Sequence, residues 1–444
     1  MWEMLSSKQQ EVIEHVKHGH TLFMTGMGGT GKSYLISLIK QHIDQTAVTA
    51  LTGTAAALIQ GQTLHSWAGL SVNPQTKDQL IAHVKREPRL LQNWRETRLL
   101  IIDEVSMMTG EMLNQLNYLG QKIRESEQFM GGLQTLFSGD FAQLPPPKCK
   151  EYLFESRIWK QIPYVVYLNE IYRQQDPEFQ TILNEIRLGT VSVKSRELLK
   201  KRMIVPGLPK SGPIQPTILF PYKKDVNQTN EQELSRWLNS EVDRHTYEGI
   251  DEYGEIESKS LCDASAPEGF SKSDHSRKKS QIPSGIRISL REILDDSLPR
   301  ELTLTVNTQV ILTTNLDVEH GLCNGARGII THFTPEGHPS IQFTTLTVVV
   351  VPRKVTLRIS RYFGQRTQYP LILGWAISIH RSQGMTLDYA VADLSNCFDY
   401  GQAYVTLSRV RSLEGLWLLG LSLRSIKCHP KVIAYYQSLL QTNP

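Results

Sequence analysis

The first 150 residues alternate short apolar runs with segments whose apolar residues recur at helical spacing. The apolar runs, which are bounded by polar or glycine-rich sequence, are residues 21–25, 47–51, 99–102 and 133–138. They have the length of buried strands. Helical spacing is clearest in SYLISLIKQHI, residues 33–43, and in residues 112–124. Such alternation is typical of a parallel sheet covered by helices, so the start of the chain is predicted to be α/β.

The rest of the chain resumes this pattern and then becomes rich in β-branched residues. Strands are predicted at 164–168 and 217–220. Residues 251–285 differ, because few are apolar and the run SKSDHSRKKSQ consists of serine and charge; a surface insertion is favoured there over a binding tail. After residue 302, the segments LTLTV, QVILTT, GIITHF, LTVVVV and KVTLRI predict a small β-rich module.

Composition adds mainly exclusions. The chain has 444 residues, 40% of them hydrophobic and 21% charged, which is ordinary for a globular protein of several domains. Its five cysteines form no CxxC pair, which argues against a disulfide framework or a cysteine-rich zinc site. A net charge of +4 is too small to indicate a nucleic-acid partner by itself. No apolar run has the length of a membrane span or a signal-peptide core, so we expect a soluble intracellular protein of the nucleus or cytoplasm.

The strongest motif is GMGGTGKS at residues 26–33, which fits GxxxxGK[ST] and stands between an apolar run and a helical segment. Glycines allow backbone amides to curl around phosphate oxygens, and the start of the helix adds a favourable potential. Lys32 is predicted to reach the β- and γ-phosphates, and the Ser33 hydroxyl to bind Mg²⁺. The other nucleotide-binding candidates in this loop are Gly26, Gly28, Gly29, Thr30 and Gly31.

Two acidic residues, Asp103 and Glu104, follow the apolar strand LLII. A strand that delivers acids at its carboxyl end is what a magnesium site beside a phosphate loop requires. Asp103 is predicted to hold the metal, and Glu104 to polarise the attacking water.

A third motif, FSGDFAQLPP at residues 137–146, again places polar groups after a strand. Gln143 is predicted to sense the γ-phosphate, because an amide can report phosphate through one hydrogen bond without carrying charge. The neighbouring Gly139-Asp140 is interpreted as a structural turn rather than a second acid catalyst.

Further segments resemble, in order, the motifs of one enzyme family. They are LSSKQ (5–9), LTGTAA (51–56), TLHSWAG (63–69), LNEIYRQ (168–174), GWAISIHRSQGMTLD (374–388) and GQAYVTLSRV (401–410). Together with the nucleotide motifs they resemble the Pif family of DNA helicases, in the RecD-like branch of superfamily one. Residues 116–136 resemble the signature block that precedes GDFxQLPP in that family. The departures are mild: Met27, Trp67 in place of the usual phenylalanine, and Arg381 where lysine is common.

The resemblance implies two RecA-like P-loop NTPase domains with ATP between them, a small wedge insertion and a small SH3-like β-barrel insertion. The expected ranges are 1–165 for the first domain with the wedge at about 70–97, 166–326 and 370–444 for the second domain with the polar insertion at about 251–285, and 327–369 for the barrel.

The resemblance also assigns residues outside the phosphate loop. Arg173 and Arg409 are expected to reach the γ-phosphate from the second domain and complete the catalytic set with Lys32, Asp103, Glu104 and Gln143. Gln9 is expected to read adenine, and Gln383 and Gly384 to line the ATP cleft. The DNA-binding candidates are Thr52, Gly53, His65, Trp67, Asn230, His380 and Arg381. For Trp67 two interpretations stay open, a ring against a base and a core tryptophan.

The leading hypothesis is an ATP-dependent, DNA-stimulated 5′-to-3′ DNA helicase of replication, repair, recombination or telomere maintenance. It is expected to use ATP and Mg²⁺, to bind single-stranded and forked or structured DNA but no membrane, and to act as a monomer or a DNA-induced dimer. A helicase-like translocase of the conjugative or exonuclease-associated type would need further domains. The alternative from another class is a helicase-derived, non-catalytic single-stranded-DNA-binding module, against which the intact catalytic set argues.

Overall fold

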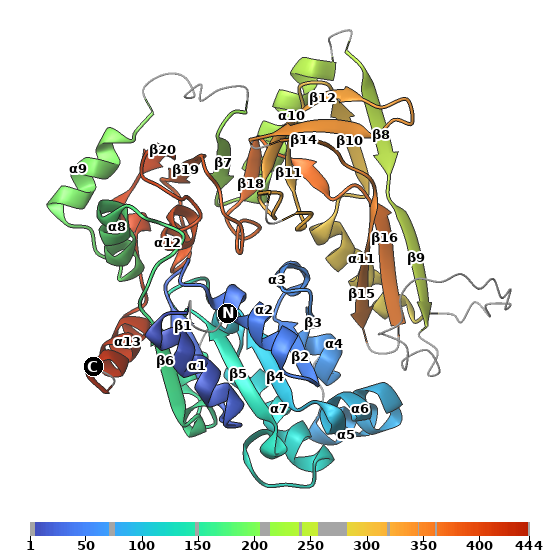
Figure 1. Ribbon diagram of the computed structural model, residues 1–444, viewed down its shortest axis with the longest axis vertical. Helices are drawn as coiled ribbons and strands as arrows, with labels where there is room; N and C mark the ends of the chain where they lie inside the picture. The colour runs from blue at the N-terminus through green and yellow to red at the C-terminus, as the bar shows by residue number, and fades with distance from the viewer. Residues whose placement is uncertain are drawn as a thin grey trace, which may run out of the picture.

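The structure is a computed structural model that describes residues 5–70, 76–146, 151–204, 214–238, 242–255, 282–317, 320–344, 346–359 and 362–442. Its first domain is built on a six-stranded parallel sheet of order β3-β2-β4-β5-β1-β6, in the lower half of Figure 1. The strands are β1 (Leu22–Gly26), β2 (Thr46–Ala50), β3 (Gln62–Thr63), β4 (Leu99–Asp103), β5 (Gln134–Gly139) and β6 (Tyr164–Leu168). β1 and β4 are buried along their whole length, which explains their continuous apolar sequence.

Helices accompany the strands of this sheet in the order that the sequence pattern predicts. They are α1 (Ser7–Lys17), α2 (Lys32–His42), α3 (Gly53–Leu58), α4 (Leu64–Ala68) and α7 (Gly110–Ile123). The apolar residues of α2 at positions 35, 36, 38 and 39 are buried, so one face of this helix packs into the core. The α/β prediction for the start of the chain is confirmed.

The predicted wedge region forms a pair of helices, α5 (Lys77–Arg86) and α6 (Pro88–Glu96), on one flank of the first domain. Thr76 caps α5, and Pro88 begins α6, where its missing N–H costs nothing. Leu80 and Trp94 are buried, so the pair is anchored on the domain core. Residues 71–75 of the predicted range lie outside the described residues, and a wedge role for this pair stays a prediction.

The second domain is built on a four-stranded parallel sheet of order β18-β7-β19-β20. The strands are β7 (Thr217–Phe220), β18 (Ala376–Ser378), β19 (Ala390–Leu394) and β20 (Leu416–Leu421), and the helices are α8 (Pro177–Arg187), α9 (Val193–Lys201), α10 (Lys223–Leu238), α12 (Gln402–Leu407) and α13 (Pro430–Thr442). The predicted boundary at 165/166 falls inside β6, which pairs with β1 and so completes the first sheet. The terminal helix α13 returns to the first domain (Figure 1). There the ring of Tyr435 stacks on that of Phe154, with 4.4 Å between the ring centroids.

The β-rich module occupies the upper right of Figure 1 and pairs in three ladders, β14-β13-β12-β11-β17, β15-β16-β9 and β10-β8. Its strands are β8 (Arg244–Glu248), β9 (Ile250–Glu255), β10 (Glu301–Thr305), β11 (Gln309–Leu312), β12 (Arg327–Phe333), β13 (Pro339–Phe343), β14 (Thr347–Val349), β15 (Arg353–Ile359), β16 (Tyr362–Gln368) and β17 (Leu371–Leu373), accompanied by α11 (Ser284–Ser297). The module extends beyond the range of 327–369 that was expected for the small barrel, because β9, β11 and β17 pair with strands inside that range or with each other. A closed SH3-like barrel stays a prediction.

The β-rich character already extends into the predicted polar insertion, since β9 covers residues 250–255. Residues 256–281 of that insertion lie outside the described residues. Among the helices of the described chain, none combines the length and the apolar character that crossing a membrane requires.

Candidate ATP site and nucleic-acid groove

The phosphate loop runs from the end of β1 to the first residue of α2, Lys32. Gly29 and Gly31 adopt the left-handed region, with φ of 89° and 85°, and a Cβ on Gly29 would lie 2.6 Å from the Cβ of Arg173. Glycine is therefore required at these turns. The Nζ of Lys32 donates to the carbonyl oxygens of Gly26 and Met27, both at 2.8 Å, so the ammonium group lies within the curve of the loop.

The two predicted acids stand at the carboxyl edge of the same sheet. Asp103 is buried and accepts a hydrogen bond from the Ser138 hydroxyl at 2.7 Å. Burial raises the pKa of Asp103, and burial together with the Asp103 carboxylate raises the pKa of Glu104 to about 7. The Oε2 atom of Glu104 and the Oε1 atom of Gln143 are buried without a hydrogen-bond partner among the described residues. Buried oxygens of this kind fit a site that a metal ion or a reacting water completes.

Both predicted arginines approach the phosphate loop. The Nη1 atom of Arg173 donates to the Ser408 carbonyl oxygen at 2.8 Å, and the Nη2 atom of Arg409 donates to the Ser408 hydroxyl at 2.9 Å. A Cβ on Gly28 would lie 3.6 Å from Arg409 Nη2. Burial and the nearby charge of Arg409 lower the pKa of Arg173 to about 9. Two guanidinium groups and an ammonium group around one loop form a site for an anion.

The three remaining ATP-cleft candidates lie in two different places. Gln9 is buried against the loop, and its Nε2 atom donates to the Thr30 carbonyl oxygen at 3.4 Å. Gln383 instead lines the large cavity described below, and a Cβ on Gly384 would collide with Leu58 of α3. Gln383 and Gly384 are thus placed beside the cavity and α3, and neither of these placements involves the phosphate loop.

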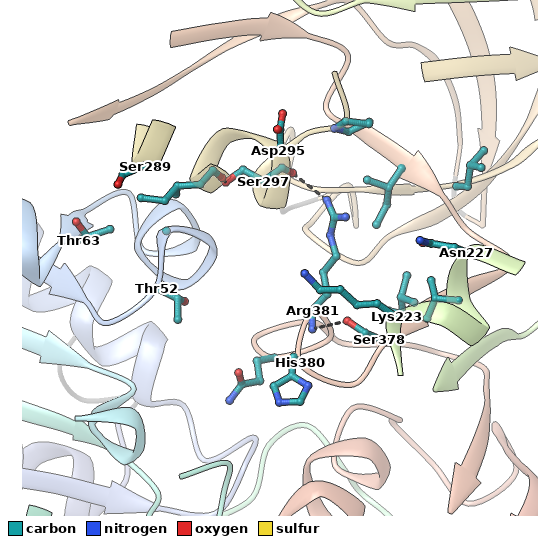
Figure 2. Close-up of a pocket in the computed structure, with 18 of the residues that line it drawn as sticks. Thr52, Thr63, Lys223, Asn227, Ser289, Asp295, Ser297, Ser378, His380 and Arg381 are labelled. Atoms are coloured by element: carbon teal, nitrogen blue, oxygen red, sulfur yellow. Dashed lines mark hydrogen bonds between the residues drawn. The ribbon is translucent and has the colours of Figure 1, made fainter. Parts of the chain in front are cut away.

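A cavity of about 1330 Å³ lies between the first domain, the second domain and the β-rich module. Six of the DNA-binding candidates line it: Thr52, Gly53, His65, Asn230, His380 and Arg381. Figure 2 shows Thr52 on the first-domain side and His380 and Arg381 on the second-domain side. The cavity is thus a groove whose walls come from all three parts of the protein.

Two of these lining residues are held in place by backbone atoms. Arg381 donates from Nη2 to the Ser297 carbonyl oxygen at 3.0 Å (Figure 2). The side-chain amide of Asn230 pairs with Ala376 on both sides, donating to its carbonyl oxygen and accepting from its N–H. Asn230 therefore fixes α10 on the edge strand β18. Burial lowers the pKa of His65, so this imidazole is neutral at pH 7.

Trp67 is a core residue, and its assignment as a base-stacking residue is corrected. Its side chain is 1% exposed, its ring lies 4.7 Å from that of Trp94, and it is not among the residues that line the groove. The Trp94 indole N–H donates to the Ala68 carbonyl oxygen at 3.1 Å. Trp67, for which the sequence allowed either a contact with a base or a place in the core, therefore packs α4 against α6.

We expect Trp67→Ala to lower the free energy of unfolding by about 3–5 kcal/mol, because it removes a large buried side chain. Affinity for single-stranded DNA, measured on the folded fraction, should change little. Trp67→Phe is the matched control, since it keeps an aromatic ring against Trp94 and should recover most of the stability. Unchanged denaturant unfolding together with a lost DNA affinity would restore the base-stacking interpretation.

Two buried residues at the loop were missed as individual site residues. Gln174 is fully buried and donates from Nε2 to the carbonyl oxygens of Ser408 and Val410. The Tyr404 hydroxyl accepts a hydrogen bond from the Gly28 N–H at 2.8 Å. Both lie inside motifs that the sequence displays, but only the packing of the two domains reveals their contacts.

The comparisons with known proteins agree with this geometry. Residues 4–197 match the family model of the PIF1-like helicases, and residues 293–333 match that of the 2B domain of DNA helicase Pif1. The crystal structure of Pif1 helicase from Candida albicans is 32% identical and superimposes with a TM-score of 0.75, over 98% of this chain and 99% of that one. The chain belongs to the Pif1 helicase family.

Other members of the Pif1 helicase family are similar to the chain over almost all of its length. The ATP-dependent DNA helicase PIF1 of Danio rerio is 36% identical over 98% of this chain, which spans 64% of that relative. The crystal structure of Bacteroides sp Pif1 in complex with ADP-AlF4 is 25% identical, with a TM-score of 0.78 over 99% of this chain and 98% of that one. The family prediction made from the motifs is confirmed.

Proposed function

We propose that the protein is an ATP-dependent DNA helicase that moves 5′ to 3′ along single-stranded DNA and unwinds duplex or structured DNA. The motif resemblance carries the direction of movement, and one structural observation carries the ATP-driven part of this proposal. The phosphate loop of the first domain meets two arginines at one buried site. Arg173 follows β6, the last strand of the first domain, and Arg409 follows the second-domain helix α12. The same two domains also form opposite walls of the groove. A change of the bound nucleotide that moves one domain relative to the other would therefore also change the distance between the groove walls.

The residues at the site fit ATP with Mg²⁺. Lys32 and the loop amides would hold the phosphates, and Ser33 and Asp103 would hold the metal, which supplies positive charge to the developing transition state. Glu104 has an unpaired buried carboxylate oxygen, as a base that orients water requires. Gln143 likewise has a buried side-chain oxygen without a hydrogen-bond partner among the described residues, which would be available to the γ-phosphate or the water. The name of the Danio rerio relative and the nucleotide analogue bound to the Bacteroides protein support this assignment.

The lining of the groove suits a single strand of nucleic acid. Its lining combines hydroxyl, amide, imidazole and guanidinium groups with backbone, which suits phosphates and base faces without sequence preference. Thr52 and His65 would contact the strand from the first domain, and His380 and Arg381 from the second. Two sets of contacts on separate domains are what stepwise movement needs, because each set can be strengthened or weakened by domain closure.

Glu104 gives the reaction a pH dependence. As the base it must be ionised, and its raised pKa of about 7 means that the active form is lost as the pH falls through that value. We expect kcat/KM for ATP, measured with saturating single-stranded DNA, to fall about tenfold per pH unit below about pH 7. The DNA affinity, measured over the same range, is the control and should not show this limb. A limb at the ordinary carboxyl value, near 4.5, would contradict the raised pKa of Glu104, and a Glu104→Gln variant with normal turnover would contradict its role as the base.

A non-catalytic DNA-binding module is the competing proposal, and ATP turnover separates the two. We expect single-stranded DNA to stimulate ATP hydrolysis strongly, and DNA affinity to fall steeply with salt because phosphate contacts release counterions. The experiment measures turnover with and without an oligonucleotide and binding across a salt series. Binding without turnover would favour the module. Turnover that ignores DNA, with a flat salt response, would favour a different phosphate-loop enzyme.

A further inference from the structure

A fully buried carboxylate, Asp140, lies at the junction of the two domains. It follows β5 of the first domain, and the Arg187 guanidinium of α8 donates to both of its oxygens, at 2.9 and 3.0 Å. Two tyrosine hydroxyls from the second half of the chain complete its environment: Tyr404 of α12 at 3.2 Å and Tyr436 of α13 at 2.9 Å. One first-domain acid is thus bound by three second-domain helices.

The charges at this junction fix the direction of every hydrogen bond. Burial opposes ionisation of Asp140, but the charge and hydrogen bonds of Arg187 outweigh it and hold the pKa of Asp140 below its usual range. Burial and the Asp140 carboxylate raise the pKa of Tyr404, so its hydroxyl stays protonated. A carboxylate can only accept, so the Tyr404 O–H donates to Asp140. The lone pairs of that hydroxyl are then available to the Gly28 N–H, which donates at 2.8 Å.

The result is a directed chain of hydrogen bonds from the phosphate loop to the junction. Tyr404 lies five residues before Arg409 in the same segment, residues 404–409. This segment packs on the phosphate loop, since a Cβ on Gly28 would lie 3.4 Å from Ser408. The Arg409 Nε atom donates back to the Val405 carbonyl oxygen, one residue after Tyr404. Fixing Tyr404 against the loop therefore helps to orient the guanidinium group of Arg409.

We propose that Tyr404 is a positioning residue, whose hydroxyl holds the phosphate loop at Gly28 in register with Arg409. Asp140 serves as its anchor, which explains a buried acid beside the ATP site that takes no part in the chemistry. The inference rests on the proposed ATP site. It goes beyond that site by giving a role to an aromatic residue that itself touches no reacting atom.

Tyr436 provides a matched control on the same carboxylate. Its hydroxyl also donates to Asp140 but accepts from the Phe141 N–H and lies 2.9 Å from the Thr25 hydroxyl, so its hydrogen bonds lead to β1 and to the segment after β5 rather than to Gly28. Tyr404→Phe and Tyr436→Phe each delete one fully buried hydroxyl and keep the ring. A structural role shared by both tyrosines would therefore give the two variants the same behaviour.

The test is the DNA-stimulated kcat and the ATP KM of both variants of the full chain, with thermal unfolding as the readout of stability. We expect Tyr404→Phe to lower kcat about tenfold with KM changed less than about twofold, and Tyr436→Phe to keep kcat within about twofold. In the Arg409→Ala background, single-turnover measurements should show that Tyr404→Phe has no further effect, because it acts through Arg409.

Equal losses of kcat in the two phenylalanine variants, or the same tenfold loss with and without Arg409, would overturn the positioning role. Unchanged kcat in Tyr404→Phe would overturn it as well. Failure of the underlying site looks different. If Lys32→Ala hydrolyses ATP normally, the site assignment itself fails, whatever Tyr404→Phe does.

Discussion

Lys32→Ala is expected to lower ATP turnover by about 10³-fold or more while leaving the fold intact. The ammonium group lies inside the curve of the phosphate loop, where its neighbours are carbonyl oxygens of the loop itself. Positive charge placed against the transferring phosphoryl group supplies most of the rate enhancement in this chemistry, so its loss cannot be offset by binding. Turnover with saturating single-stranded DNA measures the effect.

Lys40→Ala is the matched control, because it removes an exposed lysine from the same helix. It should retain turnover and stability. Thermal unfolding of both variants shows whether a loss reflects chemistry or folding. Near-normal turnover by a folded Lys32→Ala protein would remove the basis for the ATP site.

The second large effect concerns Arg173 and Arg409. Both contact Ser408, which follows the second-domain helix α12 and packs on the phosphate loop at Gly28. Arginines that stabilise a phosphoryl-transfer transition state contribute about 10³–10⁵ in rate. Replacing either one with alanine should therefore cut turnover by about that factor, and should weaken ATP binding far less. Turnover and nucleotide affinity are measured on the same variants.

A further consequence follows for DNA. If the arginines respond to ATP only when the domains close, either alanine variant should lose the difference in DNA affinity between the nucleotide-free and analogue-bound protein. Arg411→Ala is the control, because Arg411 is exposed and paired with Asp388 at 3.0 Å. Normal hydrolysis by both Arg173→Ala and Arg409→Ala would refute a motor that works across the two domains.

The sequence predicted those parts of the fold that depend on the local order of apolar and polar residues. Fully buried parallel strands such as β4 are continuous apolar runs, and α2 shows its buried face in its spacing. The β-rich module was underestimated because its partners are distant in sequence: β9 pairs with β16, and Asp251 lies opposite Arg366. Strand composition indicates a strand but not its neighbour.

The site divides in the same way. Lys32, Asp103 and Glu104 are fixed by motifs whose chemistry requires their spacing, and the structure brings them to one edge of a sheet. Trp67 could not be decided from sequence, because a tryptophan within a motif suits both a base and a core, and only its contact with Trp94 decides. The Tyr404 contact with Gly28 joins positions 376 residues apart, which no local pattern encodes.

The central claim is an ATP-driven motor that moves 5′ to 3′ on single-stranded DNA. The most direct test compares unwinding of one duplex with a 5′ single-stranded tail against the same duplex with a 3′ tail, with and without ATP. We expect ATP-dependent separation of the 5′-tailed substrate and little or none of the 3′-tailed one. Separation of the 3′-tailed duplex alone, or of neither substrate by a protein that hydrolyses ATP on DNA, would contradict the account.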